Sequence, residues 1–379
     1  MTIGTSEPSL PIAEQQAGNI TLLQNGDAIF PAMLEAIYGA RYTICFETFI
    51  YWKGKIAEEV AEALSERARA GVAVHVLLDW VGTFRMDEAL IDLMLSAGVE
   101  VEKFRPLRWF NLRRVNYRTH RKLLIVDGRI GFTGGVGVAD EWQGHAQDPE
   151  HWRDNHYRLT GAAVGELQRA FFSNWVKVHG WKPEPGSDVY YPELEPTPCL
   201  KVISGSPWSN RDQLQRMFLE AIDSANESIR IATAYFMPGE KLFRALIRAR
   251  KRGVHIEILM CGVHTDRDIV RQASRAHWGR LLKAGVRLFE YEPTLYHVKL
   301  LVVDSEWISI GSANFDARSC WLNDELNVNV HEKAVVREHI TMFQEDLAKG
   351  RKLSLVQWEQ RPVLTKIGDW ISQLFRRQL

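Results

Sequence analysis

One spacing of three reactive residues occurs twice in this chain: a histidine, a lysine two positions later, and an aspartate five positions after the lysine. The two copies are His120, Lys122, Asp127 and His297, Lys299, Asp304. Two histidines that face each other can share a phosphoryl transfer, because one attacks phosphorus while the other protonates the leaving oxygen. Two lysines beside them can hold the negative oxygens of the transition state without a metal or other cofactor. The repeat therefore predicts one catalytic site built from both halves.

A run of small residues follows each motif, and such runs let backbone N–H groups approach a phosphate. The candidate phosphate-binding residues are Gly135, Gly137, Ser312 and Asn314. Taken alone, each run is equally typical of a glycine-rich strand end. Their repeated place after the motifs favours the functional interpretation.

A histidine nucleophile also needs a carboxylate that fixes its tautomer and stabilises its cation. Asp154 and Glu325 are the candidates, since each follows its motif by a comparable interval. The sequence leaves open which carboxylate serves which histidine, and exposed loop acids are the alternative. The motif aspartates Asp127 and Asp304 are also typical of hairpin turns, so a turn-forming role competes with a direct chemical one.

The elements that must position these residues are duplicated as well. Leu34–Ile37 is matched by Leu219–Ile222, and Ala97–Val99 by Ala284–Val286, in the same order. Duplication explains this better than chance. Alternating patterns predict helices at 30–40 and 56–70 and strands at 43–50 and 72–78, hence a layered α/β lobe. We expect each motif histidine and lysine to lie on a strand and to project from one face. Returning strands are expected at 130–133 and 307–310.

The predicted domain organisation follows this duplication. It comprises a tail at 1–18, a first lobe at 19–181, a linker rich in proline and acid at 182–198, a second lobe at 199–350 and a C-terminal amphipathic segment at 351–379. With 379 residues, 46% of them hydrophobic, the chain can bury one substantial core per half.

Composition limits the partners and the compartment. Lys plus Arg and Asp plus Glu both number 47, so attraction to lipid or nucleic acid must come from local patches. The four cysteines are expected to be reduced core residues, and no secretion signal or membrane span is evident. We therefore expect a cytoplasmic protein. His145, His151 and His156 are irregularly spaced, which indicates surface histidines and not a metal site.

Two segments combine cations with aromatic residues. The loop from Arg105 to Lys122 packs seven cations around Trp109, Phe110 and Tyr117, which suits an anionic membrane surface. Single-stranded nucleic acid or a solvated loop is the alternative. Near the C-terminus, apolar residues recur at helical spacing beside basic ones: Leu364, Ile367, Trp370, Ile371, Leu374 and Phe375. That pattern is typical of a surface-bound membrane helix, although a helix docked on the second lobe or a dimer contact is the alternative. Together the segments favour lipid over nucleic acid, and among the tryptophans only Trp109 and Trp370 are assigned a function.

These residues resemble the phospholipase D superfamily, and specifically bacterial cardiolipin synthases in a form lacking N-terminal transmembrane helices. The resemblance rests on both motifs and on the segments Phe46–Phe49, Trp152–Asp154, Gly311–Asp316, Arg318–Ser319, Asn323 and Glu325. It implies two similar α/β/α lobes with pseudo-twofold symmetry and one active site between them. One departure is Gly137, which stands where the family usually has the asparagine that Asn314 provides in the second half.

The resemblance also implies a reaction through a phosphohistidine. His120 would be the nucleophile and His297 the general acid and then base, while Lys122, Lys299 and Asn314 would bind the phosphate. Two phosphatidylglycerol molecules would yield cardiolipin and glycerol at the inner face of the cell membrane. The alternatives are a phospholipase D-type hydrolase, a metal-independent nuclease and, least favoured, an inactive lipid-binding scaffold. The acceptor and the oligomeric state stay open.

Overall fold

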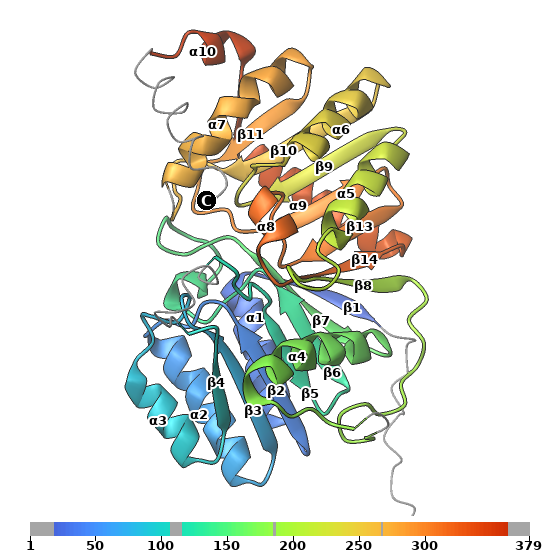
Figure 1. The fold of residues 1–379 in the computed structure, drawn as a ribbon. Coiled ribbons are helices and arrows are strands. Elements are labelled where there is room, and N and C mark those ends of the chain that lie inside the picture. Colours follow the sequence, from blue (N-terminus) through green and yellow to red (C-terminus); the bar gives the residue numbers. More distant parts are fainter. Residues whose placement is uncertain (1–18, 107–115, 185–186, 267, 363–379) are drawn as a thin grey trace, which may run out of the picture.

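The computed structural model describes residues 19–106, 116–184, 187–266 and 268–362, which form two mixed α/β lobes stacked on one another (Figure 1). The elements of the first lobe are β1 (Ile20–Gln24), α1 (Asn25–Tyr38), β2 (Thr43–Thr48), α2 (Lys55–Arg69), β3 (Ala73–Asp79), α3 (Glu88–Ser96), β4 (Glu100–Phe104), β5 (Leu123–Val126), β6 (Ile130–Gly134), the 3₁₀ turn η2 (Asp140–Trp142), β7 (Asn155–Thr160) and α4 (Ala163–His179). Those of the second lobe are β8 (Leu200–Gly205), α5 (Gln213–Ser224), β9 (Ser228–Thr233), α6 (Glu240–Lys251), β10 (His255–Cys261), α7 (Asp268–Lys283), β11 (Arg287–Tyr291), β12 (Lys299–Val303), β13 (Trp307–Gly311), α8 (Ala317–Trp321), β14 (Glu325–Val330), α9 (Lys333–Ala348), β15 (Gly350–Lys352) and α10 (Leu355–Glu359).

The two sheets share one topology, which confirms the predicted pair of similar lobes. The first sheet has the order β1-β7-β6-β5-β2-β3-β4, and the second has β15-β11-β10-β9-β12-β13-β14-β8. Without β15, the second order is that of the first read backwards, with β8 in the place of β1 and β12 in the place of β5. In both lobes the motif strand lies in the middle of the sheet, antiparallel to β2 or β9. The duplicated sequence thus places the two motifs at equivalent positions.

The hydrophobic cores do not divide between the lobes as expected. One cluster joins the interior of the first lobe to the face of the second sheet that α9 covers, and includes residues such as Phe171, Ile310 and Phe343. A second cluster fills the other face of that sheet, beneath α5 and α6. The prediction of one core per half is wrong, because the two sheets abut through an apolar surface that composition alone cannot assign. Burial of this surface fixes the lobes relative to each other.

The motif histidines do not lie on strands, contrary to the prediction. β5 begins at Leu123 and β12 at Lys299, so both histidines sit in the extended segments that lead into them. Each segment makes one parallel bridge to the opposite lobe, Thr119 to Asp324 and Tyr296 to Arg153. The histidines are therefore held at the lobe interface and not within either sheet.

The motif aspartates lie at the opposite end of these strands from the histidines. The hairpins β5–β6 and β12–β13 form as predicted, and Asp127 and Asp304 adopt positive φ angles of 52° and 53° in their turns. The Asp127 carboxylate accepts the backbone N–H groups of Arg41, Tyr42 and Thr43 at 2.7 to 2.9 Å. Asp304 does the same for residues 226 to 228. The four residues of β5 lie between Lys122 and Asp127, so five residue steps separate the two by about 16 Å. Their geometry supports a turn-fixing role and not the direct catalytic role in the prediction.

We expect Asp127→Ala to destabilise the fold without altering the chemistry. The change leaves three backbone donors without their carboxylate, a loss of about 2 to 4 kcal/mol in the free energy of unfolding. Urea denaturation measures this loss, and activity per folded molecule should stay within about twofold of the original. Asp92→Ala, at an exposed position of α3, is the matched control. Unchanged stability with lost activity would restore a catalytic role for Asp127.

One predicted boundary, the end of the second lobe at residue 350, differs from the structure. β15 pairs with β11, so the second sheet continues beyond the expected limit at residue 350, and α10 packs on α7. The expected linker is packed on the first lobe, where the Tyr190 hydroxyl lies 2.8 Å from His75 Nε2.

Cys45, Cys261 and Cys320 are buried as expected, but Cys199 is exposed. The amphipathic positions from Leu364 to Phe375 lie outside the described residues. Within the described ranges, no helix has the length and apolar character required to cross a bilayer.

Candidate active site

Both motif histidines line one cavity of about 330 Å³ between the lobes. The first lobe contributes Lys122, Phe49 and Trp142 to its wall, and the second contributes Asn314 and Arg318. Lys299 follows two residues after His297 and is buried beneath it. The sequence predicted one site built from both halves, and the structure does bring the two motifs to one cavity.

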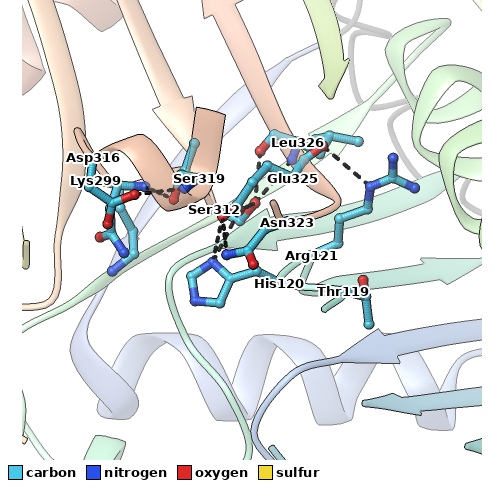
Figure 2. A network of polar contacts seen from close by, with 12 residues as sticks. Thr119, His120, Arg121, Lys299, Ser312, Asp316, Ser319, Asn323, Glu325 and Leu326 are labelled. Atoms are coloured by element: carbon cyan, nitrogen blue, oxygen red, sulfur yellow. Dashed lines mark hydrogen bonds and ion pairs between the residues drawn. The ribbon is translucent and has the colours of Figure 1, made fainter. Parts of the chain in front are cut away.

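Each histidine is oriented by a carboxylate of the opposite lobe, which settles a question that the sequence left open. His120 Nδ1 lies 2.9 and 3.1 Å from the two oxygens of Glu325, at the start of β14 (Figure 2). His297 Nδ1 lies 2.6 Å from Asp154 Oδ2, just before β7. Because an ionised carboxylate can only accept, Nδ1 carries the proton in each neutral ring. Nε2 is then the nitrogen left for chemistry.

Backbone hydrogen bonds also join each motif histidine to the opposite lobe. The N–H of His120 donates to the Asp324 carbonyl at 2.9 Å, and that of His297 donates to the Arg153 carbonyl at 2.8 Å. Lys122 Nζ donates to the His120 carbonyl at 2.8 Å, and Lys299 donates to the His297 carbonyl in the same way. Each lysine thus lies beside its own histidine, and the site is incomplete unless the lobes are docked.

The two carboxylates have different supports, so the site is asymmetric. Glu325 accepts from the Ser312 hydroxyl at 2.5 Å and from Asn323 Nδ2 at 3.2 Å (Figure 2). Asp154 instead accepts from the indole N–H of Trp142 at 3.0 Å and from the Asn155 backbone at 2.8 Å. The sequence did not indicate the Trp142 donor, because Trp142 is not one of the tryptophans assigned a function and no spacing links it to Asp154.

Gly135 explains why the first lobe differs. It occupies the position that Ser312 has in the second lobe, and a Cβ there would lie 2.3 Å from Asp154 Oδ1. Its own N–H donates to the Asn155 carbonyl. Gly135 therefore makes room for the orienting carboxylate, and it is not among the residues that line the cavity, so its phosphate contact stays a prediction.

Only one of the other predicted phosphate-binding residues lies in the cavity wall. Ser312 is fully buried and supports Glu325, so the prediction that it binds phosphate is not supported. A Cβ at Gly137 would lie 2.7 Å from Ile50 Cβ, which shows that this position faces a packed side chain. Asn314 does line the cavity, and its side-chain N–H₂ group is a donor of the kind that a phosphate oxygen accepts. Asn314 stays the candidate phosphate ligand.

Burial and charge set the protonation states of the site. Burial lowers the pKa of His120 to about 4, although Glu325 opposes the shift, so the ring is neutral near pH 7. Burial also lowers the pKa of His297, as does Lys299, while Asp154 opposes this. Burial raises the carboxyl pKa of Glu325, but the interaction with His120, which includes a hydrogen bond, and the charge of Lys122 outweigh it, so the net shift is downward. A phosphodiester anion in the cavity would favour the protonated His297 that a general acid requires.

The lysines are expected to set the alkaline limit of activity. Burial lowers the pKa of Lys122 to about 7 and that of Lys299 to about 8. Below these values both are charged and can hold a phosphate, and above them the charge is lost. For a soluble phosphodiester we therefore expect kcat/KM, which reports the free enzyme, to fall above about pH 7 to 8. The alkaline fall of kcat should occur at a higher pH than that of kcat/KM, because bound phosphate stabilises the charged lysines. Identical alkaline limbs in kcat and kcat/KM would contradict this assignment.

The predicted basic surface from Arg105 to Lys122 is partly internal. Arg121 is buried and donates to the Ala170 carbonyl at 2.7 Å and to the Ser204 hydroxyl at 2.6 Å, which ties the two lobes together. Arg118 is also buried and donates to the Arg105 carbonyl. These arginines cannot face a membrane, so that part of the prediction is wrong. Residues 107–115, which include Trp109, lie outside the described ranges.

The histidines outside the motifs show no sign of a metal centre. His145 is exposed and His151 is half-buried, but His156 is buried, where a surface position was expected. In the part of the chain that the structure describes, no cluster of three His, Cys, Asp or Glu side chains could hold a metal ion.

Two duplicated lobes with paired histidines and lysines at their interface define an enzyme of the phospholipase D superfamily. The family described as "Cardiolipin synthase, PLD-like domain" matches residues 218–347. Cardiolipin synthase of Geobacillus thermodenitrificans is 34% identical over 94% of this chain and 72% of its own length. Minor cardiolipin synthase ClsB of Bacillus subtilis is 31% identical over 96% of this chain and 90% of its own. The chain belongs to the cardiolipin synthase family of this superfamily.

A solved structure shares the whole architecture. The phosphatidylserine synthase of Haemophilus influenzae superposes with a TM-score of 0.74 and covers 95% of each chain at 15% sequence identity. At that identity the similarity shows the fold alone. It confirms the predicted two-lobed α/β fold over nearly the full length of the chain.

Proposed function

We propose that this protein is a cardiolipin synthase-type phosphatidyltransferase that acts through a phosphatidyl-histidine intermediate. The observation that carries the proposal is the pair of histidines lining one cavity, each held at Nδ1 by a carboxylate of the other lobe. Family membership gives the substrate class, because the relatives are named cardiolipin synthases. The donor and the acceptor are then both phosphatidylglycerol, and the products are cardiolipin and glycerol.

The first step forms the intermediate. His120 is neutral and presents Nε2, so it attacks the phosphorus of the donor lipid and forms a P–N bond. Lys122, Lys299 and Asn314 bind the phosphate oxygens as negative charge develops there. His297 gives its Nε2 proton to the departing glycerol oxygen. Glu325 stabilises the positive charge that His120 acquires.

A membrane surface is the expected location, at the cytoplasmic face of the cell membrane. Phe84 lines the cavity and yet leaves 73% of its surface exposed, so an apolar ring stands where a lipid chain would enter. Trp52, which also lines the cavity, stacks against Arg85 at 4.6 Å. An aromatic ring beside a cation suits an anionic headgroup layer.

The test is to incubate the purified protein with phosphatidylglycerol vesicles and analyse the lipids. We expect cardiolipin and free glycerol in equal amounts. Phosphatidic acid in place of cardiolipin would instead show a hydrolase. Vesicle binding without turnover of any phosphodiester would leave only a lipid-binding scaffold. Sedimentation with phosphatidylglycerol but not phosphatidylcholine vesicles, weakened by salt, tests the membrane location.

A further inference from the structure

The wall of the cavity beside α8 offers hydrogen-bond acceptors without obvious partners. Asp316 precedes this short helix and Asn323 follows it, and both are buried residues that line the cavity with the motif histidines. We refer to Asp316 and Asn323 as the α8 wall. Figure 2 shows them on the same lobe as Glu325.

Only the N–H₂ group of the Asn323 side chain is hydrogen-bonded within the described chain. Its Nδ2 donates to Glu325 Oε1, so its Oδ1 points elsewhere. That oxygen is buried, as is the residue as a whole, which is 7% exposed. It has no hydrogen-bond partner among the described residues. A buried acceptor without a partner is destabilising, so a ligand that donates to it gains affinity.

The Asp316 carboxylate can also accept further hydrogen bonds. Within the described chain its carboxylate takes hydrogen bonds from Ser319 only, the backbone bond being 2.7 Å long. A carboxylate can accept about four hydrogen bonds. Capping α8 therefore accounts for part of its capacity, and the rest faces a cavity whose other walls include the rings of Phe49, Trp52 and Phe84.

We propose that the α8 wall is the subsite for the acceptor's polyol headgroup: Asp316 accepts the hydrogen bond of one hydroxyl, Asn323 Oδ1 offers a further acceptor for the headgroup, and the neighbouring hydroxyl attacks phosphorus. The inference rests on the proposed transferase function and adds the residues that select a vicinal diol. In the second step the attacking hydroxyl oxygen forms a bond to phosphorus and its proton passes to His297 Nε2. The P–N bond breaks, and its electron pair returns to His120 Nε2. Water bound at the wall lacks a second hydroxyl that could reach phosphorus.

Asp316→Asn tests the subsite with little change in shape. Asparagine is an equally good helix cap, so Ser319 keeps its acceptor. The group turned to the cavity becomes a donor, however. Phosphatidylglycerol vesicles are supplied with equal concentrations of deuterated glycerol and 1-propanol. Mass spectrometry then counts labelled phosphatidylglycerol, phosphatidylpropanol and phosphatidic acid, and released unlabelled glycerol gives total turnover.

The wild-type protein should prefer glycerol to 1-propanol by about tenfold or more, which is the value of one charge-assisted hydrogen bond. Asp316→Asn should remove most of that preference and raise the share of phosphatidic acid among the products. Asp266→Asn is the matched control, since Asp266 lines the same cavity but binds the Tyr235 hydroxyl. It should keep the glycerol preference.

Several outcomes overturn the inference. One is a wild-type protein that uses glycerol and 1-propanol equally, a result that needs no variant. Others are an Asp316→Asn variant with an unchanged product ratio, or one in which all products fall together. Asp316→Ser, which also caps helices well, replaces the amide variant if thermal unfolding shows that the latter is not folded. Absence of any glycerol release by the wild-type protein overturns the proposed function as well, so the two failures are distinguishable.

Discussion

Replacement of His120 by asparagine is expected to abolish turnover, by about 10⁴-fold or more, because no other side chain can form the covalent intermediate. Replacement of His297 by asparagine should slow turnover by about 10² to 10⁴-fold, the range for loss of a general acid and base. The two variants should differ most clearly with a phosphatidyl donor whose leaving group is p-nitrophenolate. That leaving group departs without protonation, so His297 is not needed in the first step.

The resulting kinetics separate the roles of the histidines. His297→Asn should release one equivalent of p-nitrophenolate in a burst and then turn over slowly, and intact-mass spectrometry should find the phosphatidyl group on the protein. His120→Asn should show neither burst nor adduct. His145→Asn, at an exposed position remote from the motifs in sequence, is the control. A burst from His120→Asn but not from His297→Asn would exchange the roles, and an adduct on neither variant would rule out the phosphohistidine.

The parts of the fold that the sequence predicted are those encoded by local patterns. The hairpins after each motif follow from Asp127-Gly128 and Asp304-Ser305, where Asp127, Gly128 and Asp304 adopt the left-handed region. The duplication follows from segments that recur in one order. Alternating strands and helices then lead to two similar sheets. In each case, residues near each other in the chain determine the structure, so the pattern can be read without knowing the rest.

What could not be predicted depends on how the lobes dock. The pairing of His120 with Glu325 joins residues that are 205 positions apart, and its counterpart, His297 with Asp154, spans 143 positions. Neither spacing distinguishes a partner in the same lobe from one in the other. The position of Arg121 was misjudged for the same reason. Its charge suggested a surface, but the docked lobes surround it with carbonyl and hydroxyl oxygens.

The asymmetry of the site also has a physical origin that spacing does not show. The sequence pointed to Gly137 as the position where the two halves differ. In the structure the more consequential difference is at Gly135 and Ser312, because these positions adjoin the orienting carboxylates. A serine hydroxyl supports Glu325, whereas the absence of a side chain lets Asp154 approach and leaves Trp142 to support it. The carboxylate of each histidine therefore has its own set of donors.

Glu325→Gln is the change expected to show most clearly that the two carboxylates have different roles. Glutamine keeps the shape but removes the charge that stabilises the cationic His120 in the intermediate. Of its two terminal atoms only one can accept, whereas Glu325 accepts from His120, Ser312 and Asn323. If the amide N–H₂ faces His120, the ring must carry its proton on Nε2 and cannot attack. We expect kcat to fall by about 10⁴-fold, comparable with the loss of the triad aspartate in serine proteases.

Asp154→Asn should affect the other half of the reaction. With the p-nitrophenyl donor, Glu325→Gln should slow the burst itself, because His120 is impaired. Asp154→Asn should leave the burst rate nearly unchanged and slow only the later turnover, because Asp154 orients His297. Glu345→Gln, at an exposed position of α9, is the control. Equal slowing of the burst by both variants would mean that the carboxylates act on the site as a whole. Selective slowing by Glu325→Gln would show instead that each lobe tunes the histidine of the other for one step.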